Sequence, residues 1–198
     1  MKKLILVAVA ALMMGVQANA QLVAKAGFVG GIDTQRYFGN TNFEGVGLNG
    51  FAFGADYKIA LPWVKGLGAE PGVYFNFLFG RRDELNYSDI ALSLPIHASY
   101  TFDINDTVSL LGLTGPTIQI GLAKNYRYAN NKPVNLYDPD GLTYNRFMLL
   151  YDVAVGVELF SKIQITTGVD FGLTSFVRTN DMLCRRPVQY KLMVGYMF

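Results

Sequence analysis

The fold is decided by residues 147–159, which read FMLLYDVAVGVEL. Every second residue of this run, starting with the first, is apolar, whereas Asp152, Gly156 and Glu158 share the other face. A period of two is that of a β-strand, whose side chains point alternately to opposite faces. This strand therefore has one long apolar face and one face that mixes small residues with isolated charges.

The same alternation returns along the chain and predicts eight strands, at residues 22–34, 50–59, 72–79, 90–102, 108–123, 147–159, 163–174 and 188–198. The segment 108–123 is the least regular, since its leucines fall on both faces and Gly115-Pro116 predicts a bulge or kink. Strands of about ten residues cross a bilayer at the usual tilt, and small residues suit the narrow interior of an eight-stranded barrel. We therefore predict an all-β fold, an eight-stranded antiparallel up-and-down transmembrane β-barrel with its charged face toward the lumen.

The amino terminus predicts export. Lys2 and Lys3 precede an apolar run at residues 4–16, which ends in the small-residue triplet Ala18-Asn19-Ala20. This is the pattern of a secretory signal peptide, and the run is too short for a membrane helix. We expect residues 1–20 to be a signal peptide removed before Gln21, and residues 21–198 to be one barrel domain. Export through the Sec pathway would then bring the chain to the bacterial outer membrane.

Charge and cysteine content exclude several classes of function. Without the two signal lysines the chain has 15 basic and 15 acidic residues, so no basic excess favours nucleic acid. Cys184 is the only cysteine, which leaves no internal disulfide, and a single histidine makes a catalytic thiol an unfavourable reading. No cluster has the spacing of a metal site. We expect neither a cofactor nor a metal.

The connections alternate in length, which orients the barrel. The turns at residues 103–106 and 160–162 are short, whereas residues 80–89, 124–145 and 175–187 form longer polar segments. Short turns face the periplasm and long loops face outward in such barrels. The loop 124–145 mixes asparagines with four tyrosines, a composition that suits a contact surface for a partner. These tyrosines are Tyr126, Tyr128, Tyr137 and Tyr144.

Arginines also gather in the predicted outward segments. They are Arg81, Arg82, Arg127, Arg178, Arg185 and Arg186. Guanidinium groups bind phosphate well, so outer-membrane lipid and lipopolysaccharide are predicted partners. A generic solvated rim explains the same residues, and the sequence leaves both interpretations open.

Charged and nucleophilic residues on the predicted lumen face raise two further questions. Asp152, Asp170 and Lys191 lie at similar heights on successive strands, and we expect them to pair as a structural plug rather than a proton pathway. His97 and Ser99 share one face, as a base and a nucleophile would. They fall on the lumen side and no acid follows closely, so a packed lumen histidine is the favoured interpretation.

Four further features of the sequence are informative together: Leu92-Ser93-Leu94-Pro95-Ile96, Gly112-Leu113-Thr114-Gly115-Pro116, residues 151–159 and the final phenylalanine. In these features the chain resembles the PorT-type outer-membrane β-barrels of Bacteroidota. The resemblance extends over residues 21–198 and implies the barrel fold and an envelope location, and the family's namesake is implicated in type IX secretion. The ending, with Tyr196 and Phe198, is similar to the signal that the barrel-assembly machinery recognises on its clients.

These observations predict a non-catalytic outer-membrane barrel that acts as a structural or interaction component of the envelope. One form of this is an accessory subunit of a larger outer-membrane complex such as a secretion machinery, in contact with other envelope proteins. Two alternatives stay open. One is a lipid-modifying enzyme similar to the lipid A deacylases, which would use His97 and Ser99. The other is a narrow pore, which an eight-stranded barrel with a filled lumen disfavours.

Overall fold

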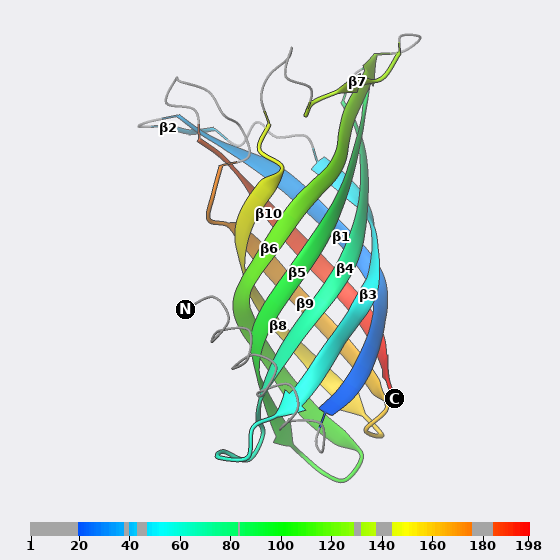
Figure 1. Ribbon diagram of the computed structural model, residues 1–198, viewed down its shortest axis with the longest axis vertical. Helices are drawn as coiled ribbons and strands as arrows, with labels where there is room; N and C mark the ends of the chain where they lie inside the picture. The colour runs from blue at the N-terminus through cyan, green and yellow to red at the C-terminus, as the bar shows by residue number, and fades with distance from the viewer. Residues whose placement is uncertain are drawn as a thin grey trace, which may run out of the picture.

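A computed structural model gives the fold of the chain (Figure 1). It describes residues 20–37, 40–42, 47–82, 84–128, 132–137, 144–175 and 184–198. The predicted signal peptide, apart from Ala20, lies outside the described residues, as do Arg178 and the rest of 176–183. Within the described residues, no helix has the length and apolar character needed to cross a membrane.

Eight long strands of the described chain form the barrel wall. They are β1 (Ala20–Tyr37), β3 (Gly47–Ala60), β4 (Leu67–Arg82), β5 (Leu85–Asp103), β6 (Val108–Tyr128), β8 (Phe147–Leu159), β9 (Ile163–Gly172) and β10 (Cys184–Met197). Each pairs antiparallel with the next in this order, and β10 pairs with β1, which closes the sheet. The predicted eight-stranded antiparallel up-and-down barrel is therefore confirmed. Two short strands, β2 (Asn40–Asn42) and β7 (Val134–Asn135), pair with β1 and β6.

The two faces of the wall differ as the alternation predicts. On β8, Asp152 is 2% exposed toward the lumen, and its neighbour Val153 is 47% exposed on the outer face. The structure also shows which faces the leucines of residues 108–123 occupy. Leu111 and Leu113 face the lumen, and Leu110 faces outward. Leu111 and Leu113 pack with Ala154 inside the barrel. The lumen thus contains apolar contacts as well as charges.

Gly115-Pro116 interrupts a pairing without forming a bulge. The pairing of β6 with β8 is continuous through both residues, whereas the pairs with β5 are missing at these two positions and the register is the same on either side of them. The register of β6 with β5 shifts farther along instead, because Ala91 pairs with Gly121 whereas Ile90 pairs with Ala123. Leu122 is the extra residue of this bulge. Beyond it, the side chains that face the lumen have even rather than odd numbers, starting with Lys124.

The predicted outward loops are partly strand, which is a second correction. β4 runs to Arg82 and β5 starts at Leu85, so most of the segment 80–89 is paired backbone. β6 continues to Tyr128, although β8 first pairs with it at Ile120. Residues 80–82, 84–90, 123–128 and 134–135 therefore extend beyond the neighbouring wall at the upper end of Figure 1, and we call them the ledge.

The opposite end of the barrel has short connections. The turns at residues 61–66, 104–107 and 160–162 lie there, together with the carboxyl terminus (Figure 1). Phe160 and Ser161 both have positive φ, as a two-residue hairpin turn that follows strand twist requires. The prediction of tight turns after β5 and β8 is therefore confirmed.

Candidate functional site

Lys191 joins the two acids with which it was predicted to cluster. Its Nζ lies 2.6 Å from Asp152 Oδ2 and 2.9 Å from Asp170 Oδ1. Asp152 and Asp170 are directly opposite each other on β8 and β9. Like charges in that position repel, so the ammonium between them compensates a repulsion that the strand register creates. The structure thus brings all three predicted lumen residues together.

His97 joins the same cluster from the far side. Its Nε2 lies 3.0 Å from Asp152 Oδ2, and both side chains are buried. Between them in register lies Gly115 on β6, directly opposite Asp152. A Cβ at Gly115 would come within 2.3 Å of the Ile96 carbonyl oxygen, so glycine permits this close approach of β5. The missing side chain also leaves room for His97 to reach across β6 to Asp152.

The acid beside His97 was missed by sequence reasoning, which looked for it close by in the chain. Asp152 is far from His97 in sequence and two strands away in the wall. Ser99, the other residue of the suggested pair, is 2% exposed and its Oγ has no hydrogen-bond partner among the described residues. Both residues face the lumen, as predicted.

A second ion cluster lies on the β1–β3–β4 side of the lumen. Lys25 Nζ lies 2.5 Å from Asp56 Oδ2 and 3.6 Å from Glu70 Oε2, and the Tyr74 hydroxyl donates a hydrogen bond to Asp56. Gly72 is directly opposite Asp56, and a Cβ there would lie 2.0 Å from Asp56 Oδ1. Sequence reasoning did not single out this cluster. Its signal was available, because Asp56 shares the glycine-rich face of β3.

Further ion pairs lie above and below these two clusters. Toward the short turns, Lys58 pairs with Glu158, which also accepts a hydrogen bond of 3.0 Å from Gln164 Nε2. Toward the ledge, Lys124 Nζ lies 3.0 Å from Asp89 Oδ2, its direct partner across the strands. Ion pairs therefore occupy the lumen at several heights.

A cavity of about 50 Å³ lies between the two central clusters. Its lining includes Lys25, Asp56, His97, Asp152 and Lys191. A cavity of that size, with charged side chains in its lining, can hold a few water molecules, which would hydrate carboxylate oxygens such as Asp152 Oδ1 that lack a protein partner. Within the described ranges, no group of three or more histidine, cysteine or acidic side chains is arranged to hold a metal ion.

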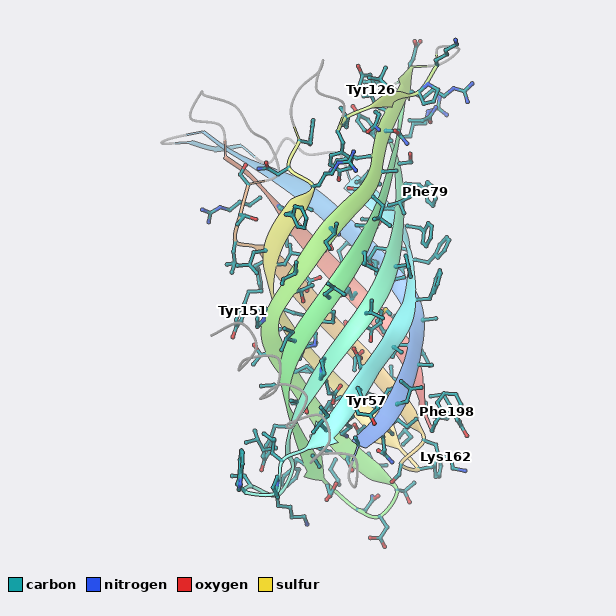
Figure 2. The ribbon with its side chains drawn as sticks, in the orientation of Figure 1. Tyr57, Phe79, Tyr126, Tyr151, Lys162 and Phe198 are labelled. Carbon is teal, nitrogen blue, oxygen red and sulfur yellow. The ribbon has the colours of Figure 1, made fainter. Side chains whose placement is uncertain are left out.

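The four tyrosines of the predicted contact loop have different environments. Tyr126, labelled in Figure 2, lies half-buried in β6. It is directly opposite Tyr87 on β5 and Val134 on β7. Tyr128 is the last residue of β6. The ring centre of Tyr137 lies 4.9 Å from the Arg146 guanidinium carbon, and that of Tyr144 lies 5.6 Å from Lys124 Nζ. Cation–π contacts thus hold Tyr137 and Tyr144 next to the ledge.

The two residues of the predicted assembly signal lie at the end of the closing strand. Tyr196 pairs with Ala24 of β1 and with Ile163 of β9. Its exposed ring makes an edge contact with Phe198 at 5.1 Å, and the Phe198 amide donates to the Leu22 carbonyl. Both rings lie on the outer surface at the end with the short turns (Figure 2 labels Phe198).

Solved structures of outer-membrane proteins are similar to this fold. Neisserial surface protein A is 11% identical, with a TM-score of 0.51, and the match covers 91% of this chain and 99% of that one. The outer membrane enzyme PagL is 7% identical, with a TM-score of 0.51 and coverage of 88% and 97%. Ail, the attachment invasion locus protein of Yersinia pestis, is 13% identical, with a TM-score of 0.47 and coverage of 91% and 99%.

No family model matches the chain, and no curated protein is similar to it in sequence. The closed eight-stranded sheet and the structural matches show that the chain has the fold of an outer-membrane β-barrel. Barrels with this fold include an enzyme and a surface protein, so the fold by itself does not assign an activity.

Proposed function

We propose that this protein is a non-catalytic, integral outer-membrane barrel whose ledge is a contact surface for another envelope protein. The observation that carries the proposal is the extension of β4, β5 and β6 beyond the wall, where β7 adds a further pairing. Extended, paired strands hold exposed side chains in fixed positions at little entropic cost on binding. Val134 on β7 is 46% exposed there, and Tyr126 lies directly opposite it.

The lumen supports the non-catalytic part of the proposal. His97 and Ser99 are both buried inside the barrel, so a lipid ester in the surrounding membrane would not reach them without opening the wall. The ion pairs across the lumen also argue against a pore, because a permeating solute would have to break buried charge pairs. The charged lumen is better understood as a plug that holds the barrel rigid.

The finer proposal concerns the setting in which the ledge acts. Following the resemblance to PorT-type barrels, the partner is a larger outer-membrane complex such as a secretion machinery, in which this chain is an accessory subunit. The Sec pathway would export the chain, and the barrel-assembly machinery would insert it through the strand that ends at Tyr196 and Phe198. The short turns would then face the periplasm and the ledge would face outward.

Site-specific photocrosslinking in intact cells tests the contact surface. A photoreactive residue at Val134 should give a discrete protein adduct, whereas one at Leu192, on the outer face of β10, should give none. Both variants should keep the gel mobility shift on heating that closed barrels show. If position 134 gives no protein adduct in a folded barrel, the ledge is not a contact surface.

The short distance between His97 and Asp152 favours one alternative, a lipid-modifying enzyme. A histidine oriented by a carboxylate is a component of many hydrolase sites. Labelled lipid A incubated with the purified protein tests it. If the wild type hydrolyses lipid A and a folded His97→Ala variant does not, the protein is an enzyme and the contact-surface proposal is wrong.

A further inference from the structure

The outer surface of β4, β5 and β6 changes from apolar to charged along three successive rows of paired residues. The lowest row is Phe77, Ile90 and Ala123, the next is Phe79, Ser88 and Asn125, and the highest is Arg81, Asn86 and Arg127. Directly paired residues of a sheet point to the same side, so each row is a line of neighbouring side chains. The change in chemistry marks the upper limit of the apolar surface on this side of the barrel.

The three residues of the highest row point away from the lumen. Arg81, Asn86 and Arg127 are exposed, whereas Lys124 and Asp89 on the opposite face of the same strands are buried against each other. The bulge at Leu122 sets the orientation of Arg127, because it reverses the parity of β6 between Gly121 and Lys124. Without the extra residue in its present place, simple alternation along β6 would turn residue 127 into the lumen.

Spacing in the row suits an anion. Neighbouring strands lie about 4.8 Å apart, so the Arg81 and Arg127 backbones are separated by about 10 Å with Asn86 between them. The two long arginine side chains can bring their guanidinium groups toward each other above the shorter Asn86, so that both guanidinium groups and the amide contact one phosphate. Guanidinium donors bind phosphate oxygens in pairs, and an amide NH₂ adds a further donor.

A continuous aromatic surface lies directly below this row, on the outer faces of β3 and β4. Its rings are Phe51, Phe53, Phe75, Phe77 and Phe79, with neighbouring ring centres 5.3 to 6.5 Å apart. Phe79, which is labelled in Figure 2, is 49% exposed and lies one row below Arg81 in the pairing of β4 with β5. Phosphate donors above an exposed aromatic surface are complementary to a lipid whose phosphate is joined to acyl chains.

We infer that Arg81, Asn86 and Arg127 bind the phosphate of a lipopolysaccharide molecule whose acyl chains pack on the phenylalanines below. The occupant is a membrane lipid rather than a soluble anion, because the donors end the apolar surface instead of lining a solvent-filled pocket. The inference depends on the proposed outer-membrane location with the ledge outward, but not on a protein partner at the ledge.

Titration of the purified full-length protein in detergent with fluorescent lipopolysaccharide tests the site. The double variant Arg81→Ala, Arg127→Ala should bind at least about tenfold more weakly, since two charge-assisted contacts are lost. Lys162→Ala, which removes an exposed cation at the opposite end of the barrel, is the matched control and should bind as the wild type does. Each variant is first shown to be folded by its heat-dependent gel shift.

Two more titrations identify the source of the phosphate. Dephosphorylated lipopolysaccharide should bind the wild type as weakly as the intact lipid binds the double variant. Unchanged binding of the intact lipid to a folded double variant overturns the site. Tight binding of inorganic phosphate with no added affinity for the lipid overturns the lipid as its occupant. The crosslinking experiment at Val134 tests the protein contact surface independently of these titrations. Failure of the lipid site and failure of the contact surface are therefore distinguishable.

Discussion

Asp152 and Val153 are neighbours in the chain, yet their side chains lie in opposite environments. Asp152 contacts Lys191 and His97 inside the barrel, and Val153 is exposed on the outer face in a row of apolar side chains. Charge on the inner face is tolerated because partners from other strands reach it. On the outer face no partner is available in lipid, so the same strand carries apolar residues there. The free-energy cost of a charged side chain in this wall therefore depends on whether it meets a partner of opposite charge or lipid.

Removing Lys191 is expected to have the largest effect. Lys191→Met leaves Asp152 and Asp170 directly opposite each other without the ammonium between them. Loss of one partner from a buried ion cluster typically lowers the free energy of unfolding by about 3–5 kcal/mol. Urea unfolding in lipid vesicles, followed by the heat-dependent gel shift, measures the change. Adding Asp170→Asn to the variant should restore part of the loss, and a single variant as stable as the wild type would show that Lys191 does not compensate the acids.

The second-largest effect is expected for a charge introduced on the outer face of the barrel. Val155→Arg puts a cation into the lipid-facing surface, which is expected to cost about 2–4 kcal/mol near the bilayer midplane. Gly112 is directly opposite Val155, and a Cβ at Gly112 would have no atom closer than 4.0 Å, so Gly112→Ala is the matched control. Folding yield into vesicles should fall for Val155→Arg and stay unchanged for Gly112→Ala. Equal yields would mean that this face is not in contact with lipid.

The ion pair nearest the ledge should matter less than the central cluster. Lys124 and Asp89 form a single pair near the rim, where water hydrates a remaining carboxylate more readily. Lys124→Met is therefore expected to destabilise by about 1–2 kcal/mol, between the values typical of surface and buried pairs. The same urea titration measures it. A loss as large as that of Lys191→Met would contradict a dependence on depth.

The smallest effect on stability is expected for Lys65, which lies in the turn between β3 and β4. Its side chain is 92% exposed, and its Nζ lies 3.8 Å from Asp103 Oδ2. Exposed ion pairs contribute little, so Lys65→Met should change the free energy of unfolding by less than about 0.5 kcal/mol. A larger change in the urea midpoint would show that this turn supports the barrel in a way its contacts do not explain.

The paired strands extend farther along the chain than the alternation of apolar and polar residues that identifies them. Residues 80–89 and 124–128 contain polar residues on both sides of the strand, so they were predicted as loops although most of them are paired. Above the apolar surface neither face of the sheet has to be hydrophobic, and the alternation that identifies a strand is lost there. The ledge was therefore not predictable from the residues that form it.

The sequence by itself determined the eight wall strands, their closure into a barrel and the face on which Asp152, Asp170 and Lys191 lie. These properties follow from a period of two, which each strand carries in its own residues and which holds wherever one face meets lipid. Only the tertiary structure decided that His97 meets Asp152 across Gly115, that Lys25 bridges Asp56 and Glu70, and that the bulge at Leu122 turns Arg127 outward. These contacts depend on the register between strands far apart in the chain, and one inserted residue changes that register without leaving a clear mark in the local pattern.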